Sequence, residues 1–284
     1  MPIKSVYVIS PVHNREDTLN AFLIGGDPDI TPLKEMRDFL EEKWITFKTI
    51  LVNDASTDET FEIIDDLWHK TIWIKPIHKN KNEMVAKALL DGYTEAIRLA
   101  PLEYRYNHPY KKNEVLFVRL DSDLEHNPKH ILELIEVVNN GADGAIHQLR
   151  YRPEDQTEID YWFDGSQGTF QGNVILGKGE SLLHNCPGYT AYRMDAMEKM
   201  LPLYQKYFKL YKEEYGVEPT WGGDMALFFI AKNILRLTIA TDLVADSTRQ
   251  SPGRTIDKVL QQIQRNTAHL LLMRKIQTGK IKFL

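Results

Sequence analysis

Two aspartates separated by one residue, Asp121 and Asp123, follow an apolar run at residues 115–120 and precede Asn127-Pro128. The apolar run is typical of a buried parallel strand, and Asn127-Pro128 is typical of a helix start. Residues i and i+2 of an extended chain point the same way, so both carboxylates can address one ion. Mg²⁺ prefers oxygen ligands and is commonly held by one or two carboxylates together with substrate phosphates. The triplet therefore favours a Mg²⁺ or Mn²⁺ site, with an ordinary acidic turn as the alternative.

The elements that must position these carboxylates alternate between apolar runs and helical patterns, as in βαβ units around a parallel sheet. We expect strands at residues 5–12, 47–54, 71–77, 115–120 and 141–151. Helices are expected at about 16–24, 32–44, 59–70, 82–100, 191–215 and 223–235, with a polar loop at 101–113. Asn14 is expected to cap the first helix, and Ser56 with Glu59 has the spacing of a capping box for the third. The triplet then lies at a strand's carboxyl end, where open α/β sheets bind ligands.

The composition is that of a globular protein with 284 residues, 43% of them hydrophobic, and a net charge of -5. This charge gives no strong nucleic-acid signal. The single cysteine, Cys186, excludes an intramolecular disulfide, and no run approaches the roughly 20 apolar residues that span a bilayer. With no signal-peptide pattern at its start, the chain is expected to be cytoplasmic. Its basic end, residues 274–282, either contacts a membrane surface peripherally or extends a packed terminal helix.

Phosphate binding through a glycine-rich turn is excluded by the segment after the first strand. Residues 10–17 read SPVHNRED and contain no glycine, and the P-loop pattern is absent. Dinucleotide-binding folds and sugar nucleotidyltransferases bring backbone N–H groups to phosphates through such a turn. A nucleotide bound here therefore needs another source of positive charge, which a cation on Asp121 and Asp123 supplies.

Four segments, in order, resemble the nucleotide-sugar-dependent glycosyltransferases of the GT-A fold, in particular glycosyltransferase family 2. They are PVHNREDTL from Pro11, ILVNDASTDET from Ile50, VRLDSDLEHNP from Val118 and GYTAYRMDAMEKM from Gly188. The resemblance covers roughly residues 4–245. It implies a single α/β domain with a Rossmann-like, mostly parallel central sheet flanked by helices. Within residues 1–284 it implies a nucleotide-sugar-binding half at 1–125, an acceptor half at 126–250 and a helical tail at 251–284.

The resemblance also implies roles for individual residues. The nucleotide would be bound by Pro11, His13, Glu16, Asp54, Lys87, Asp121 and Ser122, and the metal by Asp121 and Asp123. Lys87 is equally well explained as an exposed helical lysine, and Asp58 as a helix-capping carboxylate.

The expected catalytic base is Asp224, which corresponds to the aspartate of the family's Glu-Asp pair. Attack by an acceptor hydroxyl needs a base to take its proton. Here Gly223 replaces the glutamate, and Trp221 to Asp224 also resembles the Trp-Gly-Gly-acid motif of transferases that either invert or retain configuration. In the family, the third metal ligand is often a histidine late in the chain. The only histidine after Asp224 is His269, which lies far along the expected terminal helix, so no residue is assigned as the third ligand.

The sequence therefore predicts a metal-dependent glycosyltransferase that uses a nucleoside diphosphate sugar, with UDP favoured over GDP. The expected acceptor is a hydroxyl group, and the expected reaction inverts the anomeric carbon with Asp224 as the base. The alternatives are a retaining transferase of the same fold and a catalytically inactive nucleotide-sugar-binding module. The aromatic residues 161–163 either face an acceptor or pack in the core.

Overall fold

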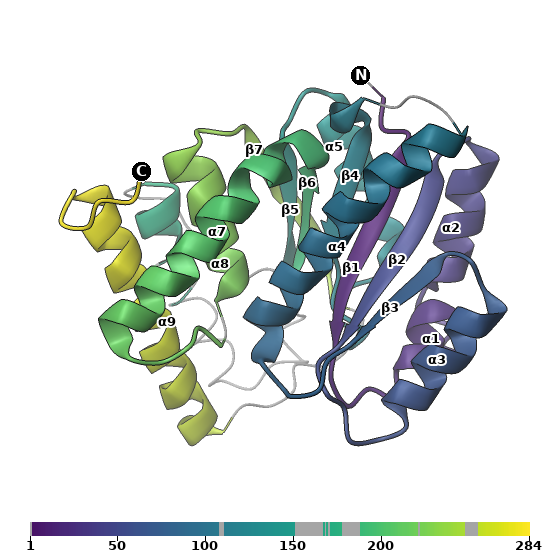
Figure 1. Ribbon diagram of the computed structural model, residues 1–284, viewed down its shortest axis with the longest axis horizontal. Helices are drawn as coiled ribbons and strands as arrows, with labels where there is room; N and C mark the ends of the chain where they lie inside the picture. Colours follow the sequence, from purple (N-terminus) through teal and green to yellow (C-terminus); the bar gives the residue numbers. More distant parts are fainter. Residues whose placement is uncertain are drawn as a thin grey trace.

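The computed structural model describes residues 2–107, 111–150, 167, 169, 171–177, 188–220, 222–247 and 255–284. Its strands form one seven-stranded sheet in the order β3-β2-β1-β4-β6-β5-β7 (Figure 1). The strands are β1 Ser5–Val12, β2 Thr46–Asn53, β3 Ile74–His78, β4 Val115–Arg119, β5 Gly144–Arg150, β6 Tyr189–Arg193 and β7 Ile239–Asp246. Only β6 runs against its neighbours β4 and β5; the other pairings are parallel. The expected α/β class with a mostly parallel sheet is confirmed.

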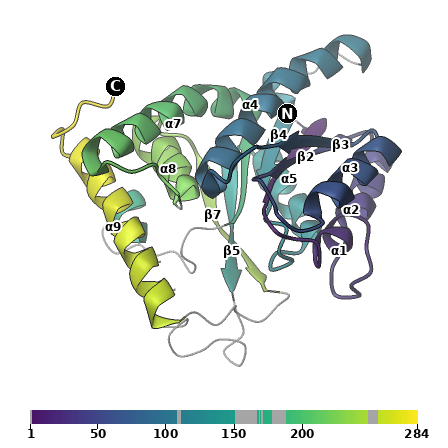
Figure 2. The same cartoon turned by 60° about the horizontal axis from the view of Figure 1, so that its bottom comes forward.

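Helices cover both faces of this sheet. They are α1 Leu19–Leu23, α2 Leu33–Glu42, α3 Thr60–Lys70, α4 Met84–Asn107, α5 Ile131–Asn139, α7 Met194–Tyr215, α8 Gly223–Phe229 and α9 Ile256–Gln277. A π-helical turn, Ile230–Ile234, continues α8, and short 3-10 turns occupy Lys112–Glu114 and Pro128–His130. In Figure 2, α9 lies beside α7 and α8, far from α2 and α3.

Alternating side chains of the strands build two separate cores. In β1, Tyr7 and Ile9 pack into the core under α4, α7 and α8. Val6 and Val8 point the other way, into the core under α1, α2 and α5. Because the sheet is buried on both faces, its parallel strands are continuous apolar runs rather than alternating ones.

The prediction of a polar loop at residues 101–113 was wrong for residues 101–107, and residues 108–110 lie outside the described residues. Helix α4 continues through Pro101 to Asn107. Tyr93, Ala96 and Ala100 are buried on the core side of this helix. Pro101 therefore lies inside a helix that is anchored by its preceding turns, at the cost of one backbone hydrogen bond. The third strand also begins later than expected, at Ile74 rather than at residue 71.

The terminal helix α9 packs on the body of the protein. Leu270, Leu272 and Met273 are buried against the core shared with α7 and α8. One of the basic residues at its end, Lys275, forms an ion pair with Glu214 of α7. Among the residues that the structure describes, no helix combines the length and apolar character needed to cross a bilayer.

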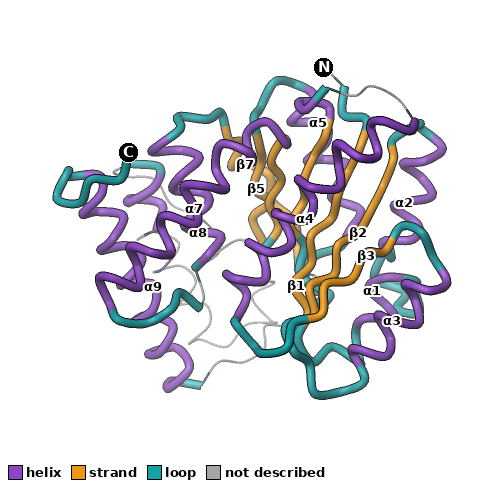
Figure 3. The backbone as a smooth tube through the Cα atoms, viewed as in Figure 1, coloured by secondary structure: helices purple, strands orange, loops and turns teal. Residues whose placement is uncertain are grey.

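The strand register brings the carboxyl ends of β1 to β4 to one edge. Val12 pairs with Asn53, Asn53 pairs with His78, and Ile9 pairs with Arg119. Figure 3 shows the loops that leave β1, β2 and β3 converging at one end of the sheet. Residues far apart in sequence are thereby brought into one place.

Candidate active site

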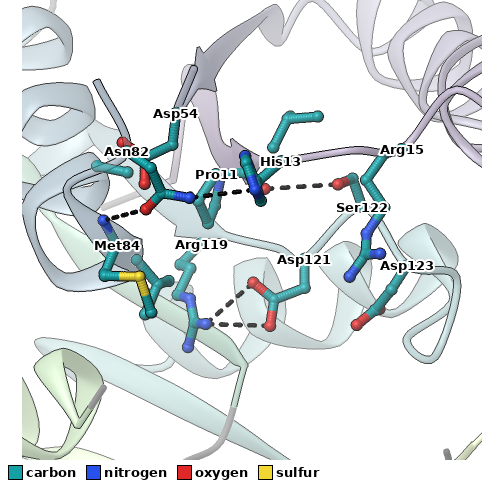
Figure 4. A pocket seen from close by; sticks show the side chains of 13 residues that line it. Pro11, His13, Arg15, Asp54, Asn82, Met84, Arg119, Asp121, Ser122 and Asp123 are labelled. Carbon is teal, nitrogen blue, oxygen red and sulfur yellow. Dashed lines mark hydrogen bonds and ion pairs between the residues drawn. The ribbon is translucent and has the colours of Figure 1, made fainter. Parts of the chain in front are cut away.

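A cavity of about 330 Å³ opens at this edge of the sheet (Figure 4). Its walls come from the segments that follow β1, β2, β3 and β4 and from the first turn of α4. The lining residues are Pro11, Val12, His13, Arg15, Asp54, Asn82, Met84, Val85, Ala88, Arg119, Asp121, Ser122 and Asp123. Six of the residues singled out in the sequence are therefore brought together: Pro11, His13, Asp54, Asp121, Ser122 and Asp123. The side chains of Glu16, Lys87 and Asp224 lie outside this lining.

Glu16 joins the loop after β1 to the loop after β2. Its carboxylate accepts the backbone N–H of Glu59 at 2.9 Å, while the Glu16 N–H donates to Asp58 Oδ2 at 3.2 Å. Asp58 Oδ1 also accepts the N–H of Thr60, the first residue of α3, at 3.1 Å. Glu16 thus connects the loop after β1 to the loop after β2 through these hydrogen bonds.

The expected capping roles of Asn14 and Ser56 were wrong. Asn14 has φ 51° and its Oδ1 accepts the N–H of Thr57 at 2.9 Å. Ser56 Oγ in turn accepts the N–H of Asn14 at 3.0 Å. These side chains bind the neighbouring loop because α1 begins only at Leu19 and α3 only at Thr60.

Asp54 is held in the cavity wall by Lys79, a residue that was not predicted to belong to the site. Asp54 Oδ1 lies 3.2 Å from Lys79 Nζ and accepts the N–H of Glu83 at 2.9 Å. Lys79 follows β3 and also lies 3.0 Å from Glu83 and 3.3 Å from Asp91. Burial by itself lowers the pKa of Lys79, but the hydrogen bond to Glu83 and the charges of Asp54 and Asp91 outweigh it and raise this pKa. Lys79 therefore stays protonated and fixes the position of Asp54.

Arg119 links the acidic triplet to Asp224. Its Nη2 donates to both carboxylate oxygens of Asp121 at 2.9 and 3.0 Å. Its Nη1 lies 2.5 Å from Oδ2 of Asp224, and the Arg119 and Asp224 side chains are each only 4% exposed. Arg119 could have been found in the sequence, because it interrupts an apolar strand two residues before Asp121 and so points the same way.

The single positive charge of Arg119 does not neutralise the two aspartates that it contacts. Burial raises the pKa of Asp121 to about 7, even though Arg119 opposes the shift, and the charges of Asp123 and Asp224 add to it. Burial also raises the pKa of Asp224, again against Arg119. A divalent cation would relieve this shortage at Asp121, whose accessible part faces the cavity beside Asp123. The carboxylate oxygens of Asp121 and Asp123 are the donors that Mg²⁺ and Mn²⁺ prefer, so the residues present fit such an ion.

The residue before Asp224 has no room for the glutamate of the expected Glu-Asp pair. A Cβ atom on Gly223 would collide with the hydroxyl of Tyr204 and with Ala86 at the start of α4. Gly222 has φ 82° and abuts His269, which is completely buried in α9. Close packing of α7, α4 and α9 around this turn therefore explains why it contains two glycines.

His13 and Lys87 have different surroundings. His13 lines the cavity, and its Nε2 lies 3.1 Å from Nδ2 of Asn82. Lys87 forms an ion pair of 2.7 Å with Asp91 one helical turn further along α4. The Lys87 side chain is 40% exposed and fits the alternative of a solvated helical lysine. Residues 161–163 and Trp221 lie outside the described residues.

An open, mostly parallel α/β sheet with a nucleotide-sized cavity and paired carboxylates at one edge is the arrangement of GT-A glycosyltransferases. The chain belongs to glycosyl transferase family 2, whose model matches residues 32–201. The chain thus has the GT-A fold of this family, as the four sequence segments predicted.

Among the proteins similar to this chain are two curated transferases. It is 27% identical over 181 residues to a dolichol-phosphate mannosyltransferase of Pyrococcus furiosus, covering 60% of this chain and 46% of that protein. It is 23% identical over 207 residues to an undecaprenyl-phosphate 4-deoxy-4-formamido-L-arabinose transferase of Serratia proteamaculans, covering 72% and 54%. The chain thus spans about half the length of both relatives.

The fold resembles that of glucosyl-3-phosphoglycerate synthase from Mycobacterium tuberculosis, with a TM-score of 0.59 at 15% identity. The likeness covers 95% of this chain and 80% of that one.

Proposed function

We propose that this glycosyltransferase takes a sugar from a nucleoside diphosphate donor, with UDP favoured over GDP, and uses Mn²⁺ or Mg²⁺ held by Asp121 and Asp123. The observation that carries the proposal is the single cavity that joins Asp54, at the end of β2, to the Asp121–Asp123 pair beyond β4. One end of this cavity has a fixed acceptor of hydrogen bonds, and the other has two oxygen donors for a cation.

The nucleoside is assigned to the end formed by Pro11, His13 and Asp54. Asp54 is 4% exposed and fixed by Lys79, so it presents a hydrogen-bond acceptor with little freedom to move. The diphosphate then lies toward Asp123, where Arg15 also lines the wall. A bound divalent cation would neutralise the charge that develops on the diphosphate leaving group.

Transfer to a hydroxyl assigns the role of base to Asp224. The acceptor oxygen forms a bond to the anomeric carbon, the bond from that carbon to the diphosphate oxygen breaks, and the nucleoside diphosphate leaves with the electron pair. Asp224 takes the hydroxyl proton, and the configuration at the anomeric carbon inverts. Because Asp224 lies behind Arg119, its carboxylate reaches an acceptor only after the Arg119 side chain moves aside.

The ion pair between Arg119 and Asp224 favours a second acceptor class, a phosphate. A phosphate oxygen is already negatively charged, so its attack needs no base and leaves Asp224 in its bond to Arg119. Both curated relatives carry a polyprenyl phosphate in their names. A polyprenyl phosphate would also be presented at a membrane, near which the basic residues Arg274, Lys280 and Lys282 can contact anionic lipid peripherally.

Donor turnover with two kinds of acceptor tests both versions. UDP-sugars and GDP-sugars are incubated with Mn²⁺ and either sugar-alcohol acceptors or a polyprenyl phosphate in detergent, and products are identified by mass spectrometry. Asp123→Asn should abolish product with either acceptor. Asp224→Asn should lower kcat by about 10²–10⁴-fold with a hydroxyl acceptor, but by less than about tenfold with a phosphate. If no donor is consumed and no nucleoside diphosphate binds, the proposal is wrong.

A further inference from the structure

On the α5 face of the sheet, the structure places two imidazoles around one carboxylate. His130 ends the turn before α5, Glu133 lies in the first turn of α5, and His147 lies in β5. His130 Nδ1 lies 2.6 Å from Glu133 Oε1, and His147 Nε2 lies 2.9 Å from Glu133 Oε2. The three ligand atoms lie within 4.8 Å of one another. Each imidazole thus turns a potential metal-binding nitrogen toward the Glu133 carboxylate.

We propose that His130, Glu133 and His147 form a second metal site, which binds Zn²⁺ and ties α5 to β5. The proposal does not depend on the nature of the sugar donor or acceptor. Imidazole nitrogen suits Zn²⁺, whereas Mg²⁺ and Mn²⁺ favour oxygen donors. The two metal sites of this protein therefore differ in the ions that they select.

The ligand set matches zinc in number and kind. Two histidines and one glutamate, with a water molecule in the fourth position, are a known zinc coordination. Zinc lies about 2.0–2.2 Å from such ligands, so tetrahedral ligand atoms lie about 3.3 Å apart. The Glu133 side chain is 45% exposed and can rotate out from between the imidazoles, while access for the ion remains open along it.

The surroundings hold the two histidines in place. His147 is completely buried, and its ring lies 5.6 Å from the ring of Tyr189. The Tyr189 hydroxyl donates to the carbonyl oxygen of Pro128 at 3.1 Å, which fixes the turn that presents His130. The rings of His130 and His147 lie 4.8 Å apart. Such outer contacts orient metal ligands and reduce the motion needed on binding.

Calorimetric titration of Zn²⁺ into the full chain tests the site. Asp123→Asn serves as the background and excess Mg²⁺ is present, so that the oxygen site does not take up zinc. After chelator treatment this protein should bind one equivalent of Zn²⁺. His130→Gln and Glu133→Gln, added singly, should each weaken zinc binding at least about tenfold. These more accessible residues carry the test because substituting the buried His147 would confound binding with folding. His69→Gln, on the exposed side of α3, is the matched control and should bind zinc unchanged.

Co²⁺ provides a second readout through its visible absorption. The parent protein should show bands of nitrogen-ligated Co²⁺ that disappear with His130→Gln and persist with His69→Gln. The proposal is overturned if no equivalent of Zn²⁺ binds. It is also overturned if His130→Gln, Glu133→Gln and His69→Gln bind zinc equally, because the three side chains would then form a hydrogen-bonded cluster only.

Discussion

At two strand ends that line the cavity, an aspartate forms an ion pair with a buried basic side chain, but the surroundings of the two ion pairs differ. At the end of β2, Asp54 is bound by Lys79 and by a backbone N–H group. Beyond β4, Asp121 is bound by Arg119, which must also serve Asp224. Lys79 also serves Glu83 and Asp91, but those two carboxylates are more than a quarter exposed and water can solvate them. The other carboxylate that Arg119 serves, Asp224, is only 4% exposed.

This difference assigns the two regions to different tasks. Lys79 and its carboxylates form a fixed support for the cavity wall, so no metal ion is expected there. The pKa of Asp121, raised to about 7 by burial, marks a carboxylate for which Arg119 alone is insufficient. A cation is therefore expected at the β4 end, and a neutral hydrogen-bonding group such as a nucleobase at the β2 end.

The largest expected effect comes from removing a metal ligand at the β4 end. Asp123→Asn should lower kcat/KM by about 1000-fold, since a bound cation supplies several kcal/mol of charge stabilisation. Asp242→Asn, an exposed aspartate on β7, is the matched control and should leave kcat/KM unchanged. Steady-state kinetics at saturating Mn²⁺ measures both. An activity of Asp123→Asn within threefold of the wild type would mean that the triplet holds no catalytic metal.

Removing the shared guanidinium should cost the most stability. Arg119→Met leaves the buried Asp224 and the 27% exposed Asp121 without their partner, so the free energy of unfolding should fall by about 3–5 kcal/mol. Urea unfolding measures this loss. Arg119→Met combined with Asp224→Asn should lose less than the sum of the two single changes, because the pair is coupled. Strictly additive losses would show that the ion pair does not form in solution.

The corresponding change at the β2 end should be milder. Lys79→Met should lower the free energy of unfolding by about 2–3 kcal/mol, because the Glu83 and Asp91 partners of Lys79 are more than a quarter exposed and water can solvate them. Its kinetic effect should be a raised KM for the donor with kcat little changed, since Asp54 is assigned to binding. A fall in kcat as large as that of Asp123→Asn would remove the distinction between the two ends.

The last expected effect, similar in size to that of Lys79→Met, is a dependence of stability on pH. The folded-state pKa of Asp121 is above its unfolded value, so this group stabilises the protein fully below pH 4 and loses that contribution as pH rises toward 7. In chelator, the free energy of unfolding should fall by up to about 1.4 kcal/mol per pH unit between pH 5 and 7 relative to Asp121→Asn. Unfolding curves of the two proteins at each pH measure the difference. Parallel pH profiles would contradict a raised pKa at Asp121.

The sequence was sufficient for those parts of the fold that depend on local patterns. Apolar runs located β1, β2 and β4, and the resemblance of the segments at their ends implied that His13, Asp54 and Asp121 belong to one site. The pairing of Arg119 with Asp224 could not be read in this way. It joins residues 105 positions apart in sequence through the packing of α8 against α4.

Local patterns also misled where tertiary contacts decide. The spacing of Ser56 and Glu59 fits a helix cap, but these residues instead form hydrogen bonds with the loop after β1. The polar composition of residues 101–113 indicated a loop, but α4 continues through Pro101 to Asn107. The Lys79 cluster was missed because Asp54 and Asp91 meet Lys79 only in the folded chain, although Glu83 is just four positions away.

The most direct test of the central claim is thermal and chemical unfolding with UDP and GDP, each with and without Mn²⁺, on the wild type and Asp123→Asn. A nucleotide at a hundredfold excess over its dissociation constant should stabilise the wild type by about 2.7 kcal/mol. We predict this gain for UDP more than for GDP, only with Mn²⁺, and not in Asp123→Asn. Equal stabilisation of both proteins, or none by either nucleotide, would contradict the assignment of Asp121 and Asp123 to a metal-bound diphosphate.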